Sequence, residues 1–269
     1  MNILVSINRS YVRYFSVALY SLTKHTGANL RVFVMHDDLS EYDRAEILAA
    51  FPEIRFEFIF MNRELCLGFP TVKRYPYTVY YRIFAPLFLP TDVDRVLYLD
   101  SDLVIHNSPD VLYDTPFGDN LFVACTHTGC ALKLLNRIRL GCGKDAVYMN
   151  TGVLLMNVSK LREVLNAEKI REFTVKNKWR LMLYDQDILY KFFGEMVKEE
   201  DSAIYNFSDR ELKKNNAFGK KKIDAEWIEK NNVIIHYIGR NKPWRSDYKG
   251  VLGGYYTDAE KEFLSEMRG

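Results

Sequence analysis

Residues 95–104 have the sequence RVLYLDSDLV, an apolar run that ends in two carboxylates separated by one residue. The apolar run predicts a buried strand over residues 95–99. In an extended segment the side chains at i and i+2 lie on the same face, so Asp100 and Asp102 can converge on one divalent cation at the exposed end of this strand. The alternative interpretation of the triplet is an ordinary Asp-rich turn.

A second polar loop follows a β-branched run near the end of the chain, where residues 233–244 have the sequence VIIHYIGRNKPW. His236 can complete a mixed carboxylate and imidazole ligand set around Mn²⁺, with Mg²⁺ as the alternative ion. Gly239 permits a ligand to approach the backbone closely, and Lys242 supplies a point charge suited to a diphosphate. The alternative interpretation of His236, which the residue taken alone favours, is a buried histidine at a strand end. The two aspartates make it a candidate third metal ligand.

The first 105 residues alternate between strand-like and helix-like patterns. The predicted strands are 2–7, 30–35, 54–60 and 95–99, and the predicted helices are 11–24, Ser40 to before Pro52, and 78–88 with a disturbance at Pro86. This repetition predicts an α/β fold with a Rossmann-like, mostly parallel sheet flanked by helices. Ligands of such sheets bind beyond the carboxyl ends of the strands, so we expect residues 8–11 and 100–102 at one edge.

The loop after the first strand offers groups for a nucleoside. It has no G-x-G-x-x-G pattern, since the next glycine is Gly27, so classical dinucleotide binding is not expected. Ser6, Asn8 and Tyr11 instead present a hydroxyl, an amide and an aromatic ring, which suit a base and a ribose. Tyr11 has the alternative role of core packing at the start of the helix.

Two polar segments in the middle of the chain are further candidates. Asn150 lies in a polar turn before the buried strand predicted at 153–157, and residues 184–189 place Asp185 and Gln186 at a helix start. Capping of that helix is the alternative role of Asp185 or Asp187. The lysine-rich residues 211–222 are predicted to be a solvated loop.

The composition predicts a single folded unit over residues 1–269, with 48% hydrophobic and 14% aromatic residues. We expect a nucleotide-binding half at 1–115 and an acceptor half at 116–269 that the segment around His236 closes. A net charge of +2 gives no field that would recruit nucleic acid. Cys66, Cys125, Cys130 and Cys142 show no C-x-x-C spacing, and no apolar stretch approaches the ~18 residues of a spanning helix. The expectation is a cytoplasmic protein without a disulfide framework.

Taken together, residues 97–104, 150–157, 185–189 and 236–244 resemble the motifs of glycosyltransferase family 8, in the same order. This family includes bacterial lipopolysaccharide glucosyl- and galactosyltransferases and, more distantly, glycogenins. The resemblance implies a GT-A fold and a metal-dependent hexosyltransferase that retains the anomeric configuration. It also implies UDP-glucose or UDP-galactose as donor, a saccharide, lipid-linked or glycoprotein acceptor, and peripheral contact with the inner face of a membrane as an open alternative.

The resemblance assigns roles to individual residues. The expected metal ligands are Asp100, Asp102 and His236. The residues expected to hold the donor nucleotide are Ser6, Asn8, Tyr11, Arg82, Ser101, Gly239 and Lys242. The residues expected to act on the transferred sugar are Asn150, Asp185 and Gln186.

One position departs from the family pattern, and two other functions stay open. Some family members carry an acidic residue near the sugar where this chain has Thr126 and His127, so their sugar preference is not transferred. The first alternative is a haloacid-dehalogenase-type phosphatase in which Asp100 is the nucleophile. The second is a catalytically inactive nucleotide-sugar-binding protein.

Overall fold

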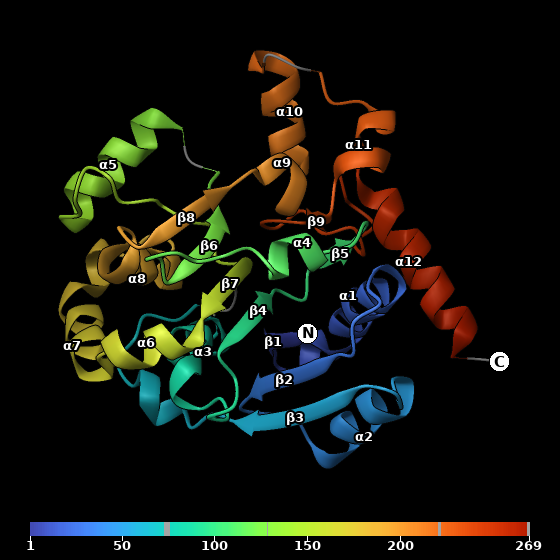
Figure 1. Cartoon of the computed structure of the whole chain (residues 1–269), viewed down its shortest axis with the longest axis horizontal. Helices are drawn as coiled ribbons and strands as arrows, with labels where there is room; N and C mark the ends of the chain where they lie inside the picture. Colours follow the sequence, from blue (N-terminus) through green and yellow to red (C-terminus); the bar gives the residue numbers. More distant parts are fainter. Residues whose placement is uncertain (73–75, 128, 220–221, 268–269) are drawn as a thin grey trace.

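A seven-stranded sheet runs through the middle of the molecule in the order β3-β2-β1-β4-β7-β6-β8, with helices on both faces (Figure 1). The structure is a computed structural model and describes residues 1–72, 76–127, 129–219 and 222–267. The strands of the sheet are β1 Asn2–Ser6, β2 Arg31–His36, β3 Arg55–Phe60, β4 Arg95–Leu99, β6 Phe122–Cys125, β7 Val153–Asn157 and β8 Val197–Glu200. A separate two-stranded sheet pairs β5 Leu103–Ile105 with β9 Ile234–His236.

Helices occur along the whole described part of the chain. The longer helices are α1 Val12–His25, α2 Glu41–Ala50, α3 Thr78–Phe84, α5 Cys130–Leu140, α6 Val158–Val164, α7 Ala167–Asn177, α8 Tyr184–Phe193, α10 Asp209–Phe218, α11 Ala225–Asn231 and α12 Gly253–Glu266. The short ones are α4 Asp110–Tyr113, α9 Ser202–Tyr205 and the 3₁₀ turns η1 Arg9–Tyr11, η2 Arg63–Cys66, η3 Ala85–Leu87 and η4 Lys178–Arg180.

The predicted mostly parallel sheet is confirmed. β1 pairs in parallel with both β2 and β4, and β7 is antiparallel to its neighbours β4 and β6. Alternate residues of β1 enter two separate cores: Ile3 and Val5 pack with residues of α1 and α12, and Leu4 packs with residues of α3 and α8. Burial on both faces explains why β1 and β4 are continuous apolar runs.

Most predicted elements of the first 105 residues are confirmed within a residue or two. Ser40 and Asp43 form the predicted capping box at the start of α2, which ends at Ala50 before Pro52. α3 gives way to the turn η3, which contains Pro86, because proline cannot continue the hydrogen-bond ladder of an α-helix.

The solvated loop predicted at 211–222 is wrong for most of its length. Residues 209–218 form α10, because Ser208 caps the helix by accepting from the Glu211 N–H and the Glu211 side chain is buried. Lys213 lies on this helix and lines a cavity of about 900 Å³. Residues 220 and 221 lie outside the described part of the chain.

Candidate active site

The two-stranded sheet brings together residues that are far apart in the sequence. Leu103 of β5 lies opposite His236 of β9, and the Tyr237 N–H donates to the Asp102 carbonyl at 2.9 Å. This register places the imidazole of His236 beside the two carboxylates that follow β4. One ligand atom each from Asp100, Asp102 and His236 lies within 4.8 Å of the others. The predicted convergence of these three side chains is confirmed.

A chain of hydrogen bonds fixes how His236 presents its ring. The Gly152 N–H donates to Asn150 Oδ1 at 3.0 Å, and the same oxygen accepts from Asn206 Nδ2 at 3.0 Å. The Asn206 oxygen therefore lies on the other side of its amide, 2.9 Å from His236 Nδ1. Because a carbonyl oxygen only accepts, Nδ1 carries the proton, and Nε2 faces the carboxylates.

This arrangement fits a divalent cation. His236 Nε2 lies 3.1 Å from Asp102 Oδ1 and 3.8 Å from Asp100 Oδ2, so in the neutral tautomer its lone pair points at two carboxylates. A cation between these atoms relieves that repulsion, and carboxylate with imidazole is a donor set that Mn²⁺ accepts. The backbone also leaves room here, since a Cβ on Gly152 would lie 2.1 Å from His236 Cε1 and 2.8 Å from Asp100 Oδ2.

Arg82 is a buried cation at the centre of the site. It reaches Asp100 Oδ1 at 3.0 Å and Asp185 Oδ2 at 3.5 Å, and it donates to the Thr151 carbonyl at 2.6 Å. Its guanidinium also lies over the ring of Tyr98 at 4.3 Å. Arg82 therefore fixes the position of a metal-ligand candidate and of a sugar-facing candidate at the same time.

Asp185 and Asp187 have different surroundings although both are buried in the first turn of α8. Asp187 pairs with Arg139 at 2.7 Å, accepts from Tyr148 and also accepts from the N–H groups of Met182 and Leu183. The capping role therefore falls to Asp187. Asp185 Oδ2 has no hydrogen-bond partner among the described residues.

The chemistry of Asp185 follows from its burial. Burial raises the pKa of Asp185 to about 6, and the charge of Arg82 offsets part of that rise. Gln186, the next residue, is half-buried and lines the cavity. The backbone that leads into both residues is strained, because Tyr184 has a φ of 29°.

Lys242 is held by the carboxylate of the D-x-D motif. Its ammonium contacts Asp102 Oδ2 and donates to the Tyr237 carbonyl at 2.7 Å. Burial opposes the ionisation of Asp102, but the charge of the Lys242 ammonium outweighs burial and holds the pKa of Asp102 well below its usual range. Gly239, which begins the loop that carries Lys242, has a φ of 96° that favours glycine.

The closing segment is anchored to the first half of the chain through an aromatic stack. Trp244 stacks on Tyr14 of α1 with ring centroids 3.9 Å apart, and Tyr11 packs edge-on against Tyr14. Tyr11 packs against the core and also lines the cavity, and its contact with a nucleoside stays a prediction.

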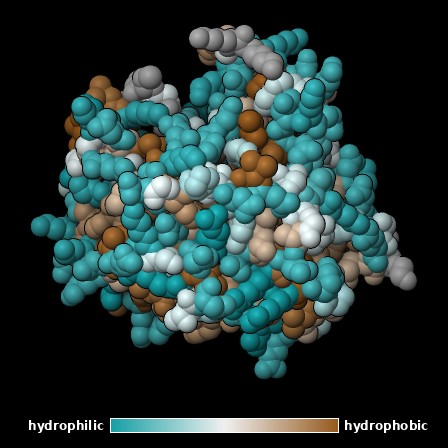
Figure 2. All heavy atoms as spheres, in the orientation of Figure 1, coloured by the Kyte–Doolittle hydropathy of each residue, from teal (hydrophilic) through white to brown (hydrophobic). Residues whose placement is uncertain are grey.

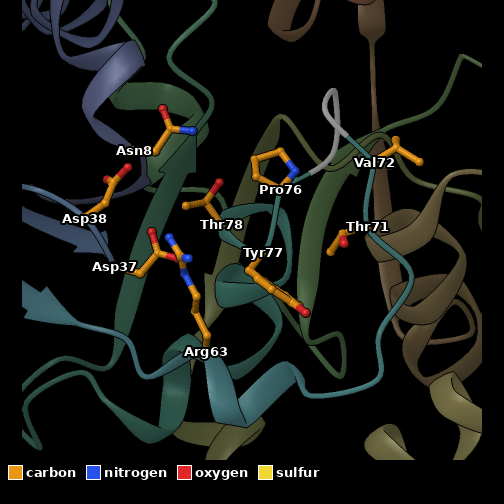
Figure 3. Close-up of a pocket in the computed structure, with 9 residues that line it drawn as sticks. All are labelled: Asn8, Asp37, Asp38, Arg63, Thr71, Val72, Pro76, Tyr77 and Thr78. Atoms are coloured by element: carbon orange, nitrogen blue, oxygen red, sulfur yellow. The ribbon is translucent and has the colours of Figure 1, made fainter.

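One cavity of about 900 Å³ contains every residue predicted for the site. Next to β1, Ser6 donates to the Thr78 carbonyl at 2.6 Å, and Asn8 lines both this cavity and a smaller pocket of about 350 Å³. Figure 3 shows this smaller pocket, with Asn8 above Asp37 and with Arg63 beside that carboxylate. Arg63 Nε lies 2.5 Å from Asp37 Oδ2.

Two residues of the site, Asn206 and Gly152, were not predicted from the sequence. Asn206 is fully buried and supports the ring of His236, and Gly152 provides the space beside the carboxylates. The polar turn before β7 was a signal for Gly152, because a glycine at a strand start often marks a close approach. Asn206 gave no such signal, since its partners lie 30 and 56 residues away.

Comparison of the chain with known proteins identifies its family. The family model described as "Glycosyl transferase family 8" matches residues 2–248, which include β1, the D-x-D motif, Gln186 and the closing loop. The chain belongs to glycosyltransferase family 8. This confirms the predicted family and the predicted enzyme class, a hexosyltransferase. The phosphatase alternative is not favoured by a family match of this extent.

Two relatives align with most of this chain. GlyE of Streptococcus pneumoniae is 26% identical over 248 residues, which cover 90% of this chain and 56% of GlyE, so the chain spans little more than half of that relative. The lipopolysaccharide 1,3-galactosyltransferase of Salmonella typhimurium is 25% identical over 281 residues, covering 96% of this chain and 77% of the relative.

A solved galactosyltransferase structure shares this architecture over almost the whole chain. The galactosyltransferase LgtC, solved in complex with donor and acceptor sugar analogs, superimposes with a TM-score of 0.81 at 28% identity over 97% of this chain and 96% of LgtC. A second LgtC structure carries a glutamine-to-glutamate change in its active site and has a TM-score of 0.83. The predicted GT-A fold is confirmed.

The Asn206 hydrogen bonds lead to a first prediction. Asn206→Ala should weaken the binding of Mn²⁺ in the presence of UDP by about 10- to 100-fold, the usual effect of removing a group that orients a metal ligand. Asn206→Asp keeps an oxygen for the His236 Nδ1–H and should recover most of that affinity. Titration calorimetry, with melting temperatures as the folding control, measures this. Equal losses in both variants would argue that Asn206 serves the fold alone.

Proposed function

We propose that this chain is a metal-dependent, retaining glycosyltransferase that moves glucose or galactose from a UDP-sugar to a saccharide or glycoconjugate acceptor. The observation that carries the proposal is the set of side chains that line one cavity. Three of them form a cluster of metal-ligand type, and Lys242 contacts this cluster. Asp185 and Gln186 line the same cavity at the start of α8.

We assign the nucleotide to the end of the cavity formed by β1 and the closing loop. Ser6, Asn8 and Tyr11 would contact uridine, and Gly239 and Lys242 would contact the diphosphate, with Ser101 beside them. When bound by Asp100, Asp102 and His236, a divalent cation would supply positive charge to the diphosphate of the departing UDP. Lys242 would add a second charge to the same oxygens, so that no protonating acid is needed.

The proposed retention of configuration comes from the resemblance to family 8, and the nucleophiles of the described site bear on which of two retaining routes is used. A double displacement needs a free carboxylate close to the anomeric carbon, as in retaining glycosidases. In this assignment Asp100 and Asp102 hold the cation, Asp185 is buried against Arg82, and Gln186 is a weak amide nucleophile. We therefore propose attack on the face that UDP leaves, with Asn150, Asp185 and Gln186 holding the sugar.

The acceptor is assigned to the second half of the chain. Residues 1–115 would bind the nucleotide sugar and residues 116–269 the acceptor, which we take to be a saccharide, lipid-linked or on a glycoprotein. LgtC has been solved with an acceptor analog, and the Salmonella relative is named for a lipopolysaccharide. Among the described residues, no helix has the length and apolar character needed to cross a bilayer. A cytoplasmic location stays a prediction.

A donor screen tests the proposed function. UDP-glucose, UDP-galactose and their N-acetyl forms are each incubated with the protein and Mn²⁺, with and without a chelator, and released UDP is measured. We expect one of the hexose donors to be hydrolysed slowly, and only in the presence of the metal. Binding of UDP-sugars without turnover of any donor, across a broad panel of acceptors, would instead favour the inactive binding protein.

The contact between Lys242 and Asp102 gives a second prediction. Lys242→Ala should lower the affinity for UDP by about 10- to 100-fold, the size expected from one charge-assisted hydrogen bond, and should leave uridine binding unchanged. The same variant should bind Mn²⁺ more tightly without nucleotide, because the ammonium no longer occupies the Asp102 carboxylate.

A matched control for this experiment lies in the same loop. Arg240 is exposed and does not line the cavity, so Arg240→Ala removes the same charge without touching the site. The assignment of Lys242 to the diphosphate fails if Lys242→Ala weakens UDP and uridine equally, or if Arg240→Ala has the same effect.

A further inference from the structure

Large apolar side chains are exposed together at one side of the cavity mouth. Seven such side chains, each at least 41% exposed, lie on α5 and in the segment 179–183. They are Leu132, Leu134, Leu135, Ile138, Trp179, Met182 and Leu183. We call this set the α5 face. Single exposed apolar residues are ordinary on protein surfaces, but a contiguous group indicates a binding surface.

The two segments of the α5 face are joined by hydrogen bonds. The guanidinium of Arg139, at the end of α5, donates to the Arg180 carbonyl, and the guanidinium of Arg180 donates to the Arg139 carbonyl. α5 lies at the periphery of the molecule in Figure 1, and Figure 2 shows hydrophobic atoms gathered over the same region. The helix is held to the molecule by its other side, where Asn136 and Leu140 are buried.

The two segments that form the α5 face contain only positively charged residues among their charged residues. Residues 130–140 and 173–183 contain Lys133, Arg137, Arg139, Lys176, Lys178 and Arg180 and no acidic residue, in a chain with a net charge of only +2. Two of these cations lie beside a carboxylate: Arg139 pairs with the buried Asp187, and Lys133 lies 3.9 Å from Glu199. Exposed aliphatic and indole groups flanked by cations match the chemistry of an anionic lipid surface.

We propose that the α5 face docks on an anionic phospholipid bilayer. Leu134, Ile138 and Trp179 enter the boundary between head groups and acyl chains, and the flanking lysines and arginines contact lipid phosphates. Leu132, Met182 and Leu183 belong both to this face and to the lining of the cavity, so docking places the cavity mouth against the lipid. Binding of this kind requires no donor and no metal, and it is independent of the proposed function.

Vesicle binding by the purified chain tests the proposal. Vesicles of phosphatidylglycerol and phosphatidylcholine in equal parts are compared with pure phosphatidylcholine in a sedimentation assay without nucleotide. We expect binding to the anionic vesicles that weakens as salt is added. The double variant Leu134→Glu with Ile138→Glu should lose at least about tenfold in affinity, because it puts two charges into the apolar contact.

Matched controls keep the result interpretable. Tyr42→Glu with Val111→Glu adds the same charge at exposed apolar positions on α2 and α4 and should bind vesicles normally. Leu134 and Ile138 do not line the cavity, so their variant should melt normally and keep any hydrolysis of UDP-sugar.

Three results would overturn the proposal. The first is equal binding to anionic and neutral vesicles, and the second is an equal loss in the two double variants. The third is self-association in solution that the α5 variant abolishes while vesicle binding is absent, since a second copy of the chain would then cover the α5 face.

Discussion

Replacing Asp102 by alanine should remove the metal-dependent part of UDP binding. The Asp102 carboxylate contacts His236 and Lys242 and is one of three groups that converge within 4.8 Å. A cation that bridges a carboxylate cluster and a diphosphate contributes several kcal/mol, so we expect a loss of about 100-fold or more in UDP affinity. His236→Ala should act in the same way. Calorimetric titration of UDP with Mn²⁺, and again with a chelator, measures the effect.

A control for Asp102→Ala lies at the other end of β4, the strand that the D-x-D motif follows. Asp94 precedes β4 and is exposed, so Asp94→Ala removes a carboxylate without changing the site. Uridine should bind equally to all variants, because it carries no diphosphate. If wild-type affinity for UDP is the same in chelator as in Mn²⁺, the proposed metal bridge is wrong.

The second large effect is expected at the start of α8. Asp185→Asn and Gln186→Ala should leave UDP affinity nearly unchanged and lower transfer by about 100- to 1,000-fold, the range seen when one group that stabilises a transition state is removed. The reason is that these side chains would act on the sugar after other residues hold the nucleotide. Their loss should therefore lower kcat and kcat/KM together.

The pH dependence of Asp185 gives this prediction a direction. Because burial raises the pKa of Asp185 to about 6, the carboxyl is neutral below that pH and ionised above it. Only the ionised form can stabilise the positive charge that develops on the sugar when UDP leaves. We expect kcat/KM to fall as the pH is lowered through about 6, and Asp185→Asn should lack this dependence.

Asp187 provides a matched control two residues away. It is fully buried and accepts from Arg139, Tyr148 and two backbone N–H groups, so Asp187→Asn should lower the melting temperature. Turnover of the folded fraction should change much less. If Asp185 were structural in the same way, Asp185→Asn would lose stability and keep full turnover once folded.

The sequence predicted the sheet well because its signals are local. The apolar runs of β1 and β4 are buried on both faces, and the capping box of α2 lies within four consecutive residues. The D-x-D triplet and His236 were identified from residue type and position at strand ends. Parallel pairing of β1 with β4 places the two loops that follow these strands at one edge of the sheet.

Other features could not be predicted because they depend on contacts between distant residues. The position of Arg82 between Asp100 and Asp185, and the support of His236 by Asn206, appear only when three segments meet. The predicted solvated loop at 211–222 was wrong because that prediction relied on the lysines and left out the helix cap at Ser208. The α5 face was missed for a similar reason, since exposed leucines at helical spacing are typical of a buried helix.

The most direct test of the proposed function is proton NMR of the product formed from the active α-linked UDP-hexose and its acceptor, recorded with Mn²⁺ and then with a chelator. We expect an α-linked product in the presence of the metal and no product in chelator. A β-linked product, or equal turnover in chelator, would contradict the proposed metal-dependent, retaining transfer.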